Sequence, residues 1–254
     1  MHPDWRHQVE TGRLVCPRTH APLALSGDVL VTQTGDFGYP VRSGVPILLA
    51  DQEAVDAYLS AERSSMQAEY AAPPRWWRRV YAGLLAWVGD MRPPAAQDAF
   101  GRIFSGLGPD SICVSIGGGP TRANDRLINL NLAPFANVDL VADAYHLPYA
   151  DGSVDAVHIE AVLEHLELPD RAVREIARVL APGRLAFVAT PFLQVFHGYP
   201  DHFQNFTSSG HRRLVERAGL EVLEIGTCVG ATFALRDVAT NYLRALLPGG
   251  RLGR

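Results

Sequence analysis

The 254-residue sequence has few cysteines. Cys16, Cys113 and Cys228 form neither a CxxC pair nor the even set that a disulfide framework needs, so we expect reduced thiols. No apolar run reaches the roughly 18 to 20 residues of a membrane span, and the first residues lack the apolar core of a signal peptide. We therefore predict a cytoplasmic protein without a transmembrane segment.

The sequence also has no excess of positively charged residues. The net charge is −4 and the isoelectric point is about 6.1, which disfavours a nucleic-acid substrate and favours a small molecule. Hydrophobic residues make up 47% of the chain, enough for one large domain or for a core with a small accessory piece.

Three apolar stretches predict short buried strands, each ending in a turn or at a polar residue: residues 112–116, 138–142 and 154–159. The first runs into Gly117, Gly118 and Gly119, which tolerate positive φ and let a ligand lie against backbone. Ligands of open α/β sheets sit at the carboxyl ends of strands. Asp143 follows the second stretch, where it could hold a purine or a ribose; the alternative is an Asx turn.

The stretch from residue 169 to 180 has apolar residues at helical spacing and predicts a helix that packs one face on a sheet. Pro182 and Gly183 should end this helix, and residues 184–190 supply the next strand. Strands that alternate with helices indicate an α/β fold with a largely parallel sheet and right-handed crossovers.

Five segments in sequence order resemble a bacterial class I S-adenosylmethionine-dependent methyltransferase family of the type 11 kind. They are NLN at 129–131, VADAYHLPYADGSVDAV at 141–157, VLEHL at 162–166, RVLAPGR at 178–184 and PFLQVFHGYPDHFQNFT at 191–207. The resemblance implies a Rossmann-like sheet over residues 109–254, S-adenosylmethionine as cofactor, and methyl transfer to a small molecule, with secondary metabolism as a setting.

The same resemblance assigns a set of residues to the cofactor: Gly117, Gly119, Asn131, Asp143, Ala144 and Glu160. The sequence departs from the family pattern where Ser115 replaces an acidic residue, Thr121 a third glycine, and Asn131 the acid that binds ribose. Each loss at a cofactor contact costs about 1 to 2 kcal/mol, because charge-assisted hydrogen bonds are the stronger ones. The departures leave open two alternatives, a methyltransferase fold with altered chemistry and a non-catalytic binding or partner subunit.

The acceptor should bind at residues 191–207, which mix aromatic side chains with groups that can take a proton. We expect His197 to be the first candidate base, with His202 and Asp201 next, and Tyr199, Phe203 and Phe206 to line the substrate. The alternative is that these are hydrogen-bonded loop residues. The spacing of the histidines and the aspartate is too generic to predict a metal site.

Residues 1–50 contain a segment that resembles a Trm112-like zinc ribbon, most closely in YPVRSGVPILL at residues 39–49. Zinc needs about four thiolate or imidazole ligands, but Cys16 alone remains, with Thr19, Thr32 and Gly35 at the other positions. We therefore predict a small β-ribbon without its metal.

Residues 51–108 predict a helical linker broken by prolines. The amphipathic stretch 75–91 fits a helix packed on the core, a lid over the substrate, or a helix on a membrane surface. Near the C-terminus, residues 220–225 predict an edge strand and residues 231–247 a helix that lines the pocket or forms a homodimer.

Overall fold

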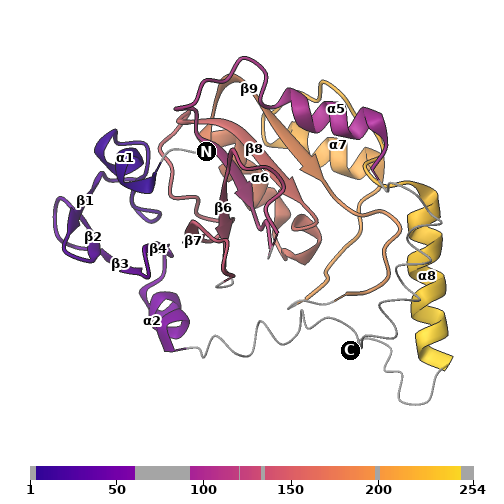
Figure 1. Ribbon diagram of the computed structural model, residues 1–254, viewed down its shortest axis with the longest axis horizontal. Coiled ribbons are helices and arrows are strands. Elements are labelled where there is room, and N and C mark those ends of the chain that lie inside the picture. Colours follow the sequence, from indigo (N-terminus) through magenta and orange to yellow (C-terminus); the bar gives the residue numbers. More distant parts are fainter. Residues whose placement is uncertain (1–3, 61–91, 120, 133–134, 198–200, 247–254) are drawn as a thin grey trace.

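Nine strands form one mixed sheet in the computed structural model, which describes residues 4–60, 92–119, 121–132, 135–197 and 201–246 (Figure 1). The sheet order is β1-β2-β3-β4-β7-β6-β5-β8-β9. The strands are β1 (Leu23–Ser26), β2 (Val29–Thr32), β3 (Gly38–Arg42), β4 (Val45–Leu48), β5 (Cys113–Ile116), β6 (Leu127–Asn131), β7 (Leu140–Ala142), β8 (Val154–Glu160) and β9 (Leu180–Ala189). The helices are α1 (Trp5–Glu10), α2 (Gln52–Ser60), α5 (Pro94–Arg102), η1 (a 3₁₀ turn, Leu163–His165), α6 (Pro169–Val179), α7 (Ser208–Arg217) and α8 (Ala231–Leu246).

The central strands run parallel, as the alternating pattern predicts. Ile116 at the end of β5 lies opposite Leu130 of β6 and Ile159 of β8, so these strands end at the same edge of the sheet. Strand β7 pairs with β6 in the same direction, and β8 pairs with β9. The predicted α/β fold with a largely parallel sheet is confirmed.

The two faces of the sheet are covered by different helices. Side chains alternate between the faces along each strand, so Val114 packs in a cluster with α6, whereas Cys113 packs with Phe187 and the residues around α5. The buried positions of α6 are the apolar residues whose spacing predicts it. The helix ends at Val179 and β9 begins at Leu180, somewhat earlier than the proline and glycine suggest.

The N-terminal ribbon continues the same sheet. Its strands β1 to β4 pair antiparallel, and β4 then pairs parallel with β7, with Ile47 opposite Val141. The Cys16 thiol lies 3.0 Å from the Tyr39 hydroxyl, and Phe37 donates its backbone N–H to the Thr32 hydroxyl at 3.3 Å. Hydrogen bonds therefore stabilise the turns at these positions. The division into residues 1–50, 51–108 and 109–254 stays a prediction.

A half-buried arginine, Arg178, fixes the loop after β7 to helix α6. The Arg178 guanidinium donates to both carboxylate oxygens of Glu175 at 2.7 Å, to Asp151 at 2.8 Å and to the carbonyl of Tyr149 at 2.7 Å. Glu175 also accepts from the backbone N–H of Leu147. The LPYADG segment is thereby held in one conformation beside the predicted cofactor residues.

Two sequence expectations for the outer segments have different outcomes. Residues 220–225 do not form a strand: Leu223 is 69% exposed, and the segment is held at Glu224 by an ion pair with Arg102 rather than by a β-ladder. The helix expected at 231–247 is α8.

The stretch 75–91 lies outside the described residues. In the part of the chain that the structure describes, none of the helices is long and apolar enough to cross a membrane.

Two buried tyrosines make a matched test of this packing. The Tyr149 hydroxyl is buried with no hydrogen-bond partner among the described residues, whereas Tyr39 contacts Cys16. Tyr149→Phe should raise the free energy of unfolding by up to about 1 kcal/mol, and Tyr39→Phe should lower it by about 0.5 to 1 kcal/mol. Urea unfolding measures both. Equal destabilisation by the two changes would contradict this packing.

Removal of the Arg178 side chain should destabilise the fold, because the half-buried Glu175 carboxylate and the carbonyls of Leu147 and Tyr149 lose their donor at once. We expect Arg178→Ala to lower the free energy of unfolding by about 2 to 3 kcal/mol. The control is Arg212→Ala, which breaks an exposed pair with Glu216 and should change stability by no more than about 0.5 kcal/mol. A similar small effect at Arg178 would show that the loop is not held by it.

Candidate cofactor and acceptor site

The glycine turn after β5 stands at the edge where the parallel strands end. Gly117 and Gly119 have φ of 69° and 64°, a region that favours glycine. A Cβ on Gly117 would lie 2.4 Å from Val162 Cγ2, so the turn packs directly against the segment that follows β8. A Cβ on Gly119 would meet no described atom within 4 Å. The outer side of the turn is therefore open to a ligand.

Asn129, inside the NLN motif, supports this turn and was not among the predicted site residues. Its side-chain amide donates to the carbonyls of Gly119 at 3.4 Å and Asn137 at 3.2 Å. A Cβ on Gly118 would lie 2.3 Å from the Asn129 Oδ1 atom, which is buried and has no hydrogen-bond partner among the described residues. A side chain at position 118 would therefore displace the Asn129 amide. Asn131, the predicted ribose contact, is the half-buried last residue of β6.

Asp143 shapes the turn that follows β7. Its carboxylate accepts a hydrogen bond from the backbone N–H of Tyr145 at 3.0 Å and lies 3.9 Å from His146 Nδ1. The Asx turn considered from the sequence is thus present. The side chain is 29% exposed, so part of the carboxylate remains accessible. Ala144 is buried directly after it.

A chain of hydrogen bonds leads from the core to Glu160 at the end of β8. His158 Nε2 donates to the Glu160 carboxylate at 3.3 Å, so Nδ1 is the acceptor for the Ser115 hydroxyl at 3.0 Å. Arg92, which precedes α5, donates to both Glu160 oxygens at 2.6 Å. Ser115, at the position where the family has an acid, is therefore linked to the carboxylate of a neighbouring strand.

Burial opposes the charge on Glu160, but the hydrogen bonds from His158 and Arg92 outweigh it and hold the pKa of the carboxyl below its usual range. Arg92 also stands within 6 Å of the rings of Phe100 (5.8 Å) and Phe187 (5.9 Å). Nothing in the sequence marked Arg92 or His158 as site residues. Arg92 stands 68 positions from its partner Glu160, so no local pattern could connect the two.

The loop after β9 brings the predicted acceptor residues to the same edge. His197 Nδ1 donates to the carbonyl of Val195 at 3.0 Å, which leaves Nε2 with the lone pair, 3.9 Å from Glu164. His202 has both nitrogens engaged: Nδ1 accepts from the backbone N–H of His197 at 3.4 Å, and Nε2 donates to Asn205 at 3.0 Å. The two imidazole rings are 4.5 Å apart.

The other predicted acceptor residues take different places. Asp201 is exposed and its carbonyl accepts from His165 Nδ1 at 2.5 Å. Phe203 is 51% exposed, and its backbone N–H donates to the carbonyl of Glu164 at 2.8 Å. Phe206 is half-buried against the core. Tyr199 lies outside the described residues. Their assignment to catalysis and substrate binding stays a prediction.

The loop arginines considered from the sequence have structural partners. Arg122 forms a bidentate pair with Asp139, at 2.7 and 3.0 Å, and Arg126 donates to the carbonyl of Leu107 at 2.9 Å. They hold the short connection between β5 and β6, which contains no helix among its described residues.

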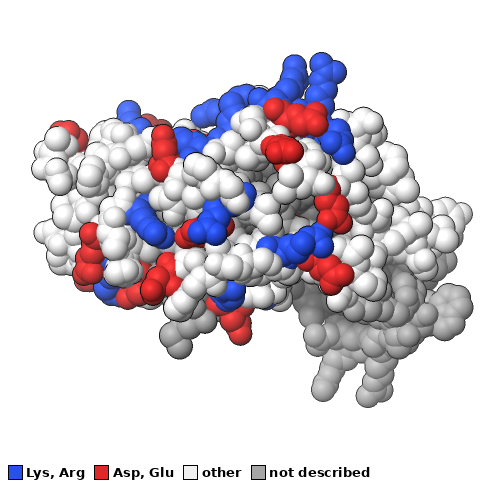
Figure 2. Space-filling view, turned by 90° about the horizontal axis from the view of Figure 1, so that it is seen from above, with Lys and Arg blue, Asp and Glu red and all other residues white. Residues whose placement is uncertain are grey.

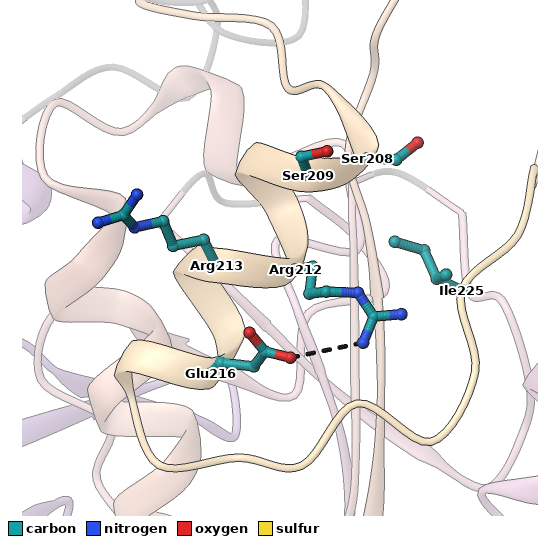
Figure 3. Close-up of a pocket in the computed structure, with 6 residues that line it drawn as sticks. All are labelled: Ser208, Ser209, Arg212, Arg213, Glu216 and Ile225. Carbon is teal, nitrogen blue, oxygen red and sulfur yellow. Dashed lines mark hydrogen bonds and ion pairs between the residues drawn. The ribbon is translucent and has the colours of Figure 1, made fainter.

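A hollow of about 450 Å³ lies beside α7 (Figure 3). It is lined by Ser208, Ser209, Arg212, Arg213, Glu216 and Ile225, with Arg212 turned toward Glu216. None of the predicted cofactor or acceptor residues lines it.

The charge on the face seen in Figure 2 is mixed. Acidic and basic side chains are interspersed, with arginines gathered along one edge. All of the basic residues are arginines, since the sequence contains no lysine. A surface on which both charges are interspersed is in keeping with the small net negative charge of the chain.

Parts of this chain are similar to known methyltransferases. Residues 121–188 match a family model described as a methyltransferase domain. The methyltransferase GfsG of Streptomyces halstedii is 37% identical over 120 residues, which is 41% of this chain and 41% of that protein. The chain thus spans less than half the length of this relative. The predicted resemblance to methyltransferases is confirmed over the matched residues, and the family match supports S-adenosylmethionine as the cofactor.

Two further likenesses concern the ribbon and the fold. A UPF0434 protein of Marinomonas sp. (strain MWYL1) is 53% identical over 38 residues, 14% of this chain and 58% of that protein, and this match supports the predicted Trm112-like ribbon. A solved S-adenosylmethionine-dependent methyltransferase of Thermotoga maritima aligns with a TM-score of 0.41 at 22% identity, covering 50% of this chain and 70% of that one.

The Glu160–Arg92 pair has a pH-dependent effect on stability. Because the folded-state pKa of Glu160 lies below its usual value of 4.5, its contribution is present above pH 4.5 and is lost as the pH falls through the folded-state pKa. Glu160→Gln should lower the free energy of unfolding at pH 7 by about 1 to 2 kcal/mol, and the difference from the wild type should shrink in acid. Urea unfolding at a series of pH values measures this.

Arg92→Ala alone and combined with Glu160→Gln completes a double-mutant cycle. We expect a coupling energy of about 1 kcal/mol at pH 7. Additive effects, or a Glu160→Gln deficit that stays constant into acid, would show that the pair does not act as the structure indicates.

Proposed function

We propose that this chain transfers a methyl group from S-adenosylmethionine to a small molecule, in a setting such as secondary metabolism. The observation that carries the proposal is the meeting of the glycine turn, Asp143 and Glu160 at the carboxyl ends of parallel strands. In sheets of this type such an edge is the place where nucleotide ligands bind. The match of residues 121–188 to a methyltransferase domain supports the same assignment.

The residues at this edge fit the proposed cofactor. The open outer side of Gly119 would receive the amino-acid part of the ligand, and Asn131 and Asp143 would accept hydrogen bonds from its ribose and adenine. The backbone around the buried Ala144 would lie against the adenine ring. Glu160 would face the ammonium group of the methionine end, which requires that it share or exchange its pair with Arg92.

When bound, S-adenosylmethionine supplies a methyl group that is already activated by the sulfonium. The chain's own residues then have to hold the acceptor in line with that methyl group and remove its proton. His197 is the leading candidate for the base, because its Nδ1 is tied to a carbonyl and its Nε2 carries the lone pair. His202 and Asp201 remain candidates, and Tyr199, Phe203 and Phe206 would contact the acceptor.

A second function is favoured by one observation. Glu160 already has a cationic partner in Arg92, and Ser115 stands where the family has an acid, so the cofactor site lacks charge that it would ordinarily use. A methyltransferase-shaped binding or partner subunit, or an enzyme with altered chemistry on the same fold, accounts for that loss. Cytoplasmic residence, a homodimer and the absence of a nucleic-acid partner also stay proposals.

Calorimetric titration of the full chain with S-adenosylmethionine and S-adenosylhomocysteine tests the proposal. We expect micromolar binding, about −8 kcal/mol. Absence of binding at millimolar ligand would support the subunit alternative instead. The assay needs no knowledge of the acceptor.

Asp143→Asn separates ligand binding from folding, because asparagine keeps an acceptor for the Asx turn but loses the charge. We expect affinity for S-adenosylhomocysteine to fall about tenfold, or about 1.4 kcal/mol, with little change in stability. The control is Asp98→Asn, at an exposed position on α5, which should bind as the wild type does. Equal affinities for all three proteins would exclude Asp143 from the site.

A further inference from the structure

Glu164, in the turn that follows β8, carries a buried carboxylate that the proposed methyl transfer does not use. Its side chain is 0% exposed, and neither oxygen has a hydrogen-bond partner among the described residues. A carboxylate in that position costs several kcal/mol unless it is paired, protonated or bound to a metal.

Two imidazole rings face this carboxylate. Nε2 of His165 is 3.8 Å from Glu164 Oε1, and Nε2 of His197 is 3.9 Å from the same atom. The three possible ligand atoms all lie within 4.8 Å of one another. The histidine side chains are 17% and 33% exposed, so an ion could reach the cluster from solvent.

Backbone carbonyls orient both rings in the way that metal sites require. His165 Nδ1 donates to the carbonyl of Asp201 at 2.5 Å, and His197 Nδ1 donates to that of Val195 at 3.0 Å. A histidine that donates through one nitrogen presents the lone pair of the other, and metal-ligating histidines almost always have such a partner. Both lone pairs are thereby directed to the side of the cluster where the buried carboxylate lies.

We propose that Glu164, His165 and His197 bind one divalent transition-metal ion, with zinc as the probe. Two imidazoles and one carboxylate are a usual ligand set for zinc and related ions, and three protein ligands leave a position for water or substrate. Ligand atoms on a tetrahedral zinc ion lie about 3.4 Å apart. The separations in this structure, 3.8 and 3.9 Å to Glu164 and up to 4.8 Å within the cluster, therefore have to shorten when an ion binds. The ligands come from the segments that follow two neighbouring strands, β8 and β9.

The backbone at the start of this turn is unusual. Ala161 has a φ of 54°, a left-handed conformation that non-glycine residues rarely adopt. It directs the chain into η1, where Glu164 turns inward while its carbonyl accepts from the N–H of Phe203. Strain of this kind persists where the surrounding structure holds it, and it gathers at functional sites.

The role of the ion rests on the proposed function. An ion at this position could bind an acceptor oxygen in its open position and lower the pKa of that hydroxyl. His197 would then be a ligand rather than the base. His202 would be the neighbouring imidazole, and its Nδ1 would have to give up the long hydrogen bond from the His197 N–H to receive a proton.

Metal binding is tested without any cofactor or acceptor. The full chain, purified without a histidine tag and treated with a chelator, is titrated with zinc by competition with a chromophoric chelator. We expect one ion per chain. Glu164→Gln, His165→Ala and His197→Ala should each weaken binding by at least about tenfold. His7→Ala, an exposed histidine on α1, is the matched control and should bind as the wild type does.

Cobalt distinguishes this site from the cysteine thiols. Cobalt(II) held by two imidazoles and a carboxylate should show visible d–d bands without the strong near-ultraviolet band of a thiolate ligand, and the bands should disappear in Glu164→Gln. Glu164→Gln keeps the shape of the side chain, and its urea unfolding transition checks that it folds. Zinc binding that is absent, or equal in Glu164→Gln and His7→Ala, would overturn the proposal. Neither result depends on whether S-adenosylmethionine binds.

Discussion

The parallel register of β5, β6 and β8 is the constraint on which the rest of the molecule depends. Ile116 lies opposite both Leu130 and Ile159, so the glycine turn, Asn131 and Glu160 emerge at one level of the sheet. A slip of one residue would turn each strand's side chains to the other face. The contact between Gly117 and Val162 then fixes the segment that carries Glu164 and His165 against the glycine turn. The position of the predicted cofactor residues and the position of Glu164 and His165 therefore both depend on this strand register.

The ribbon and the core depend on each other through the sheet. Strand β4 covers the edge of β7, which would otherwise expose unpaired backbone groups. The Trp5 indole donates to the carbonyl of Gly44 at 2.9 Å and holds α1 against the ribbon. Where a zinc ribbon has ligands, this chain has hydroxyl and thiol hydrogen bonds such as Cys16 to Tyr39. The small ribbon gains stability from the sheet that it extends.

Much of the core could be predicted from the sequence, because its signals are local. The short apolar stretches located β5, β7 and β8, and the helical spacing of Ala172, Val173 and Ile176 located α6. The glycine turn needed no tertiary information. The prediction of a strand at residues 220–225 was wrong, since an apolar alternation cannot reveal that β9 already forms the edge of the sheet.

The site itself depends on contacts between distant positions, and these could not be predicted. Arg92 reaches Glu160 across 68 residues, and Ser115 reaches His158 across 43. Glu164 and His197 belong to two motifs that the sequence marks, but only the fold brings them together. The Asx turn at Asp143 was foreseen as an alternative, because that geometry is local.

The central claim is that the carboxyl ends of β5 to β8 form a binding site for S-adenosylmethionine. Hydrogen exchange of the full chain, measured by mass spectrometry with and without S-adenosylhomocysteine, tests it most directly. The account predicts slower exchange in peptides that contain residues 116–119, 129–132, 142–146 and 160–165, and no change in α7 or the ribbon hairpins. Protection confined to the hollow beside α7, or no protection at saturating ligand, would contradict it.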